Sequence, residues 1–118
     1  MAEMLVVKSK IRDVASDCNV GGDVADKLSE IAVGIVRKAA KRAKANGRKT
    51  VQARDVFIGE LVSEPMLVVK SKIRDVVTDM NVGGDLPEAL NSMLVWTLDQ
   101  GCKRADANGR KTIQARDL

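Results

Sequence analysis

Two long stretches of the chain place apolar residues at intervals of three or four, the spacing of one face of an α-helix. The members of the two stripes are Val24, Leu28, Ile31, Ala32, Ile35 and Ala39, and then Leu86, Leu90, Met93, Leu94, Leu98 and Cys102. Asp23 and Asp85 precede the stripes as candidate N-caps. Asn46-Gly47 and Asn108-Gly109 follow them, and glycine accommodates a left-handed helix end. The pattern predicts two helices of about 22 residues, each about 33 Å long.

A shorter amphipathic segment precedes each long helix. Ile11 and Val14 are spaced for one helical face, as are their counterparts Ile73 and Val76, and we expect Ser9 and Ser71 to be the N-caps. The stretch Asn-Val-Gly-Gly then separates the short helix from the long one. Pro87 suits the first turn of the second long helix.

Short β-branched segments follow the long helices. We expect an extended piece at Lys49-Thr50-Val51-Gln52 and its counterpart in the second half. Asp55 is predicted to cap a third helix that runs from Val56 to about Val62. The second half stops at Leu118 and lacks this helix.

The chain contains the same sequence twice. A shift of 62 residues overlays residues 4–56 on 66–118 with 32 identities in 53 positions. We divide the chain into a first half (4–62), a linker with Pro65 (63–65) and a second half (66–118), together forming one domain. Two repeats are too few for a solenoid, so each half is expected to cover the apolar face of the other.

The identity is unevenly distributed. Between residues 24 and 40 only Leu28 and Val33 match their counterparts, whereas surface-type residues such as Lys8 and Lys10 are kept. Uniform drift after a duplication does not produce this distribution. The pattern favours an engineered chain, made by redesign or grafting.

Composition favours packed helices. Of 118 residues, 45% are hydrophobic but only 2% aromatic, so the core is built from Ala, Val, Leu, Ile and Met, and we expect an all-α fold. Two Cys without His make neither a disulfide framework nor a metal site, and a packing role in a reducing compartment fits them. No apolar run reaches the length of a membrane span. We expect a soluble cytoplasmic protein without a cofactor.

The order of these elements resembles the histone fold. The stretch "NGRKTVQARDV" is similar to the second loop of archaeal-type histones, and each half resembles the short bacterial and archaeal histones that lack a full third helix. The resemblance implies a head-to-tail handshake in which the long helices cross and the first loop of one half pairs with the second loop of the other. Asn19-Val20-Gly21 would pair with Thr112-Ile113-Gln114, and Asn81-Val82-Gly83 with Thr50-Val51-Gln52.

The same resemblance assigns the site residues. It pairs Arg48 with Asp55 and Arg110 with Asp117 as loop clamps, the second being the weaker because it lies beside the chain end. It implies that double-stranded DNA is bound by the paired loops and the first helices. These surfaces carry Lys8, Ser9, Lys10, Arg12, Arg48, Lys49, Thr50, Lys70, Ser71, Lys72, Arg74, Arg110, Lys111 and Thr112. Lys and Arg neutralise phosphates without identifying bases, so we expect sequence-independent binding. The resemblance further implies DNA compaction and, for a natural protein, a nucleoid location.

Charge both supports and limits this interpretation. The formal net charge is +4, with +6 in residues 4–56 and +1 in residues 66–118, so the first half should contribute more to DNA binding. The first loop, "NVGGD", carries no basic residue. The alternative is that the charges only solvate helix faces.

A second interpretation is a structural or designed scaffold, or a protein-interaction module, that needs no DNA. Gly34 aligns with Trp96 near the middles of the long helices, where a large side chain opposite a small one would make the pairing specific. Otherwise Trp96 lies partly exposed at the edge of the stripe. The halves are expected to pair within one chain as a monomeric pseudo-dimer, with a swapped dimer as the alternative.

Enzymatic activity is not expected. The chain has no His for acid–base chemistry at neutral pH and no Tyr, and no Ser or Cys lies in a nucleophile motif. "VGGDV" lacks the Lys of a phosphate-binding loop, and Asp23 occupies the helix start. No small-molecule substrate is therefore predicted.

Overall fold

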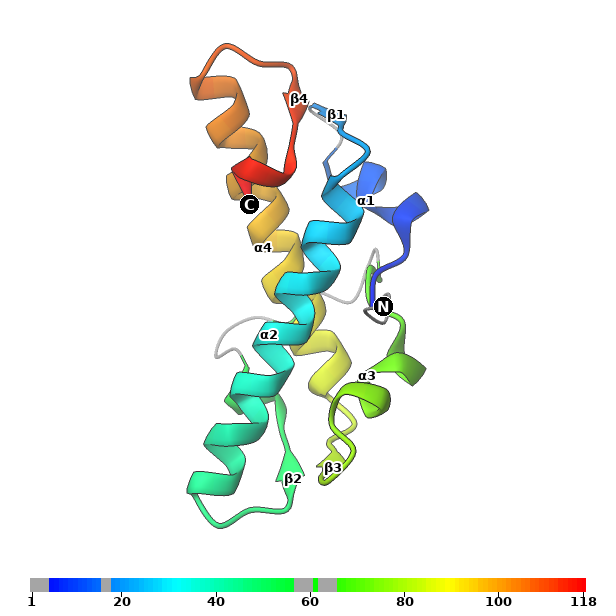
Figure 1. Cartoon of the computed structure of the whole chain (residues 1–118), viewed down its shortest axis with the longest axis vertical. Helices are drawn as coiled ribbons and strands as arrows, with labels where there is room; N and C mark the ends of the chain where they lie inside the picture. Colours follow the sequence, from blue (N-terminus) through cyan, green and yellow to red (C-terminus); the bar gives the residue numbers. More distant parts are fainter. Residues whose placement is uncertain (1–4, 16–17, 57–60, 62–65) are drawn as a thin grey trace.

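Two long helices cross to form the body of the molecule. The computed structural model describes residues 5–15, 18–56, 61 and 66–118. α2 (Val24–Ala45) and α4 (Leu86–Ala107) each contain 22 residues, and they cross near their middles (Figure 1). The short helices α1 (Lys8–Val14) and α3 (Lys70–Val76) lie along one edge. The predicted all-α architecture and the predicted long helices are confirmed.

Each long helix ends where the sequence predicts. Gly47 and Gly109 follow the last turns with φ of +72° and +74°, in the left-handed region where a Cβ is disfavoured. The side-chain amides of Asn46 and Asn108 donate hydrogen bonds to the carbonyls of Arg42 and Arg104, four residues back. The chain can therefore turn sharply where it leaves each long helix.

Two small parallel sheets join the halves at opposite ends of the molecule. β1 (Asn19–Val20) pairs with β4 (Thr112–Ile113), and β2 (Thr50–Val51) pairs with β3 (Asn81–Val82) (Figure 1). The register aligns Asn19 with Thr112 and Thr50 with Asn81. Both pairings are the ones that the handshake predicts, so every strand finds its partner in the other half.

A one-turn 3₁₀ helix follows the second strand of each half. These are η1 (Ala53–Asp55) and η2 (Ala115–Asp117). Asp55 is the last residue of η1, and its carboxylate accepts a hydrogen bond from the backbone N–H of Gln52, at 2.8 Å. Most of the third helix predicted from Val56 to about Val62 lies outside the described residues.

The N-cap predictions are only partly correct. α1 and α3 begin at Lys8 and Lys70, one residue before Ser9 and Ser71, so those serines lie in the first turn and do not cap it. Asp23 and Asp85 hold the N-cap positions, but their carboxylates accept hydrogen bonds from the other half. Asp23 Oδ1 accepts from the N–H of Ala115, at 3.2 Å, and Asp85 Oδ1 from the N–H of Ala53, at 3.3 Å.

The two "LVV" segments meet at the centre of the molecule, which the sequence did not reveal. Val6 and Val68 form an antiparallel bridge, flanked by hydrogen bonds from Val7 N–H to the Leu67 carbonyl and from Val69 N–H to the Leu5 carbonyl, both at 2.7 Å. The N–H groups of Leu5 and Leu67 donate to the buried side chains of Ser29 and Asn91, at 2.9 and 2.7 Å. These side chains occupy equivalent positions, so each half satisfies its own buried backbone group.

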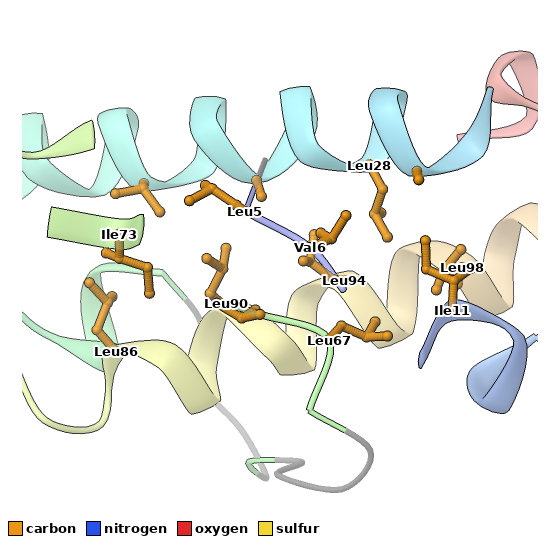
Figure 2. Close-up of a cluster of buried hydrophobic side chains, with 14 of the residues drawn as sticks. Leu5, Val6, Ile11, Leu28, Leu67, Ile73, Leu86, Leu90, Leu94 and Leu98 are labelled. Atoms are coloured by element: carbon orange, nitrogen blue, oxygen red, sulfur yellow. The ribbon is translucent and has the colours of Figure 1, made fainter. Parts of the chain in front are cut away.

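One core is shared by both halves. Leucine, isoleucine and valine side chains from α2, α4, α1, α3 and the central bridge fill the space between the long helices (Figure 2). Val36 and Ala43 are buried although they were absent from the predicted stripe, whereas Ile31 and Ile35 are only half-buried. The buried face of α2 is therefore rotated slightly from the predicted one.

The structure decides two questions about side chains on the long helices. Trp96 is 56% exposed, and a Cβ built on Gly34 would meet no atom within 4 Å, so the two residues do not form a large–small pair and the alternative of a partly exposed Trp96 holds. Cys18 and Cys102 are not independent packing residues. They form a disulfide, with Cα atoms 6.3 Å apart, which ties the residue before β1 to α4 of the other half.

Candidate nucleic-acid interface

The second loop of the first half is held by an ion pair. The guanidinium of Arg48 donates two hydrogen bonds to the carboxylate of Asp55, at 2.8 Å to Oδ2 and 2.6 Å to Oδ1. The N–H of Arg48 also donates to the carbonyl of Ala43 in α2, at 2.9 Å. Parallel N–H donors match a carboxylate geometrically, so the turn between α2 and η1 is fixed at both of its ends.

The second half repeats this geometry. Arg110 donates to both oxygens of Asp117, at 2.8 and 2.7 Å, and the Gln114 N–H donates to Oδ2 at 2.8 Å. Asp117 is 3% exposed and Asp55 5%. The contacts of the second clamp therefore match those of the first, although Asp117 lies next to Leu118 at the chain end.

The ion pairs change the titration of the carboxylates. Hydrogen bonds from Arg110, and then from the Gln114 backbone, lower the pKa of Asp117 to about 2, although burial acts in the opposite direction. The same causes lower the pKa of Asp55. Both carboxylates are therefore charged at neutral pH, and both guanidiniums are already engaged.

The residues next to the ion pairs face solvent. Lys49 and Lys111 are exposed, whereas Thr50 and Thr112 are half-buried members of β2 and β4. Arg48 and Arg110 are half-buried. At each end of the molecule the loop thus presents one exposed ammonium group beside a fixed guanidinium.

The remaining predicted contact residues lie on α1 and α3. Lys8, Ser9, Lys10 and Arg12 are exposed, as are Lys70, Ser71 and Arg74, while Lys72 is half-buried. Each helix has only seven residues, so its charge comes mainly from these side chains and little from a helix dipole.

The three groups of residues share one edge of the molecule. In Figure 1 the β1–β4 pair lies at the top, the β2–β3 pair at the bottom, and α1 and α3 lie between them on the right. The molecule extends 47 Å along its longest axis. The strands and short helices that carry the predicted contact residues are therefore arranged along this edge.

Other kinds of site are not evident in the described residues. They contain no group of three or more His, Cys, Asp or Glu side chains placed to hold a metal ion. Within the described ranges, none of the helices has both the length and the apolar character needed to cross a membrane.

Comparisons with known proteins identify the fold. Neither protein-family models nor curated protein sequences give a match. The structure is similar to that of the histone from Methanopyrus kandleri, with a TM-score of 0.61 and 18% identity over 95% of this chain and 89% of that one. It is also similar to a protein of Thermus thermophilus, with a TM-score of 0.63 and 19% identity over 97% and 92% of the two chains. Since the matched region includes both halves, the chain as a whole has the histone fold.

Proposed function

We propose that the chain binds double-stranded DNA without sequence specificity, through contacts to phosphates, and has an architectural role in compacting it. The observation that carries the proposal is the placement of Lys49 and Lys111. Each is exposed beside an ion-paired loop, and the two loops lie at opposite ends of one edge. Because the loop backbone is already fixed, binding must order the two lysine side chains but not the loops that carry them.

The chemistry of this edge suits the DNA backbone rather than the bases. Lysine is a compact point charge that neutralises phosphates and carries no sequence information. The described strands and short helices carry no aromatic side chain, so a stacking platform for single strands is not available there. The histone fold supports the same assignment, because the resemblance to histones implies duplex DNA as the ligand.

The size of the edge limits the footprint. A duplex aligned with the 47 Å axis would be covered over about 14 base pairs, at 3.4 Å per base pair. If five or six phosphates are contacted, the logarithm of the affinity should fall against the logarithm of salt with a slope of about −4 to −6. Duplexes of unrelated sequence should give nearly the same affinity.

Fluorescence anisotropy with a labelled random-sequence 20-bp duplex tests the proposal at several salt concentrations. Lys49→Glu with Lys111→Glu should weaken binding strongly and make the salt slope shallower by about 2, with unchanged melting. The matched control is Arg54→Glu with Arg116→Glu, which makes the same charge change at exposed positions of η1 and η2. η2 lies away from α1 and α3 (Figure 1), so the control should bind more tightly than the test variant. Absence of binding by the unmodified chain at about 50 mM salt would contradict the proposal.

A second candidate is a protein-interaction scaffold that needs no DNA. Exposed Trp96 favours it, because large apolar side chains on a surface are typical of protein interfaces. If this is the function, the unmodified chain should not bind DNA. Sedimentation would then show self-association that Trp96→Ala abolishes, whereas a monomer at low micromolar concentration contradicts association through this residue.

A further inference from the structure

The duplication builds the same groove twice, once at each end of the molecule. At the β2–β3 end, a groove of about 270 Å³ separates α2 from α3 and the segment that follows it. Its lining residues are Arg37, Ala40, Lys41, Lys44, Val76, Val77, Asp79 and Met80. At the β1–β4 end the equivalent groove, of about 280 Å³, is lined by Cys18, Asp99, Cys102, Lys103, Asp106, Arg110 and Lys111. We call these the first and second grooves.

The two grooves have opposite charge at equivalent positions of the long helices. Arg37 and Lys44 of the first groove correspond to Asp99 and Asp106 of the second, and Lys41 corresponds to Lys103. These three helix positions therefore carry +3 in the first groove and −1 in the second. With Asp79 counted in the first groove, and Arg110 and Lys111 in the second, the whole linings carry +2 and +1, so the contrast between the grooves lies on the long helices.

Each groove contains an ion pair, but the two ion pairs join different elements. In the first groove Asp79 contacts Lys44 at 3.1 Å, in an exposed pair of the kind that contributes little energy. In the second groove Lys103 contacts Asp99 at 3.2 Å, four residues away on the same helix. The grooves also differ in their uncharged lining residues. Ala40 and Met80 of the first groove occupy the positions equivalent to Cys102 and Cys18, which form the disulfide in the second groove.

The first groove adjoins the proposed DNA-binding edge. The N–H of Asn81, which follows the groove residue Met80, donates to the carbonyl of Lys49 at 2.9 Å. Lys44 lies in the last turn of α2, and the chain then turns at Gly47 into the Lys49 loop. The sugar–phosphate backbone of a duplex bound at Lys49 would thus lie beside the first groove.

We infer that the first groove is a phosphate-binding site that continues the DNA contact of Lys49 onto α2, whereas the contact of Lys111, which itself lines the second groove, does not continue onto α4. The inference rests on the proposed function and makes the two ends of the molecule unequal: the β2–β3 end binds the duplex more tightly than the β1–β4 end. Arg37, Lys41 and Lys44 lie on one face of α2 at spacings of four and three residues. They span about 10 Å of helix, which matches about three successive phosphates of one strand.

Exchanging charges between the grooves tests the inference with matched variants. Arg37→Asp with Lys44→Asp gives the α2 positions of the first groove the charges of the equivalent α4 positions, and Asp99→Arg with Asp106→Lys does the reverse; all four positions are exposed. With the labelled 20-bp duplex at about 100 mM salt, the first variant should bind roughly tenfold more weakly, with a salt slope shallower by about 2. The second should bind more tightly, with a steeper slope. Melting curves check that both variants fold.

The outcomes separate this inference from the proposed function. One outcome overturns the groove inference alone. In it the unmodified chain binds DNA and Lys49→Glu with Lys111→Glu weakens binding, but Arg37→Asp with Lys44→Asp retains the original affinity and salt slope. Polyglutamate tests another ligand class. If polyglutamate binds the unmodified chain and binds Arg37→Asp with Lys44→Asp more weakly, while the affinity for DNA is the same for both proteins, the first groove is a site for acidic protein segments instead. Failure of the unmodified chain to bind any duplex contradicts the proposed function itself.

Discussion

Gly101 of α4 lies directly against Ile113 of β4. A Cβ built on Gly101 would come within 2.6 Å of Cδ1 of Ile113 and 3.0 Å of Cδ2 of Leu118. The equivalent positions in the first half hold Ala39 and Val51, both fully buried. The half with the larger β-strand residue therefore has the smaller helix residue, so the volume of the pair is kept nearly constant.

Gly101→Ala should destabilise the protein by about 1 kcal/mol, because overpacking outweighs the gain in helix propensity. Adding Ile113→Val recreates the Ala–Val pair of the first half and should recover stability. A double-mutant cycle measured by denaturant unfolding gives the coupling. Gly34→Ala is the control: no atom lies within 4 Å of a Cβ there, so it should stabilise α2 by about 0.5–1 kcal/mol. Additive effects of Gly101→Ala and Ile113→Val would contradict the packing relationship.

Local signals account for the part of the fold that the sequence predicted. The 22-residue helices follow from their apolar spacing and from Gly47 and Gly109, which the structure holds at positive φ. The strand partners followed from the resemblance to histones. The candidate DNA-contact residues rest on the same resemblance, and the structure adds that Lys49 and Lys111 are exposed while Arg48 and Arg110 are engaged.

The missed features depend on contacts between residues far apart in the chain. The Val6–Val68 bridge joins two segments that look like ordinary apolar runs when each is considered alone. Cys18 and Cys102 are 84 residues apart, and only the pairing of β1 with β4 brings them together. For Trp96 the sequence left two placements open, paired with Gly34 at the helix crossing or partly exposed, because helical spacing alone does not fix which positions of two crossing helices meet; the structure has the exposed one.

Reduction of the Cys18–Cys102 disulfide should lower the free energy of unfolding by about 2–4 kcal/mol. The disulfide closes a long loop and so restricts the unfolded chain. Denaturant unfolding with and without dithiothreitol measures the difference, and Cys18→Ala with Cys102→Ala should be insensitive to the reductant. Two titratable thiols in the denatured, unreduced protein after mild oxidation would contradict the linkage.

Acid should weaken the loops through Asp55 and Asp117. Both carboxylates have a folded-state pKa below the ordinary value of 3.8, and that of Asp117 is about 2. The contribution of Asp117 to stability is therefore present above about pH 4 and is lost as the pH falls through about 2, and that of Asp55 is lost in the same direction, as the pH falls below the ordinary pKa. Asp55→Asn and Asp117→Asn should each cost about 2 kcal/mol at pH 7 when measured by denaturant unfolding, and the cost should shrink in acid.

The two Asn variants also compare the loops directly. Because the contacts of Arg48 and Arg110 are the same, the two costs should be nearly equal. Asp106→Asn removes the same charge from an exposed position of α4 and serves as the control. A much smaller cost for Asp117→Asn than for Asp55→Asn would show that the chain end weakens the second ion pair.

Trp96 should emit like indole in water and should be quenched readily by iodide, because it is 56% exposed. It is the one Trp in the chain, so the emission reports on this position alone. Trp96→Ala should change the free energy of unfolding by no more than about 0.5 kcal/mol, the usual range for surface positions. Truncating a buried Trp would instead cost about 3–5 kcal/mol. Blue-shifted emission together with a loss of that size would place Trp96 in the helix crossing after all and restore its pairing with Gly34.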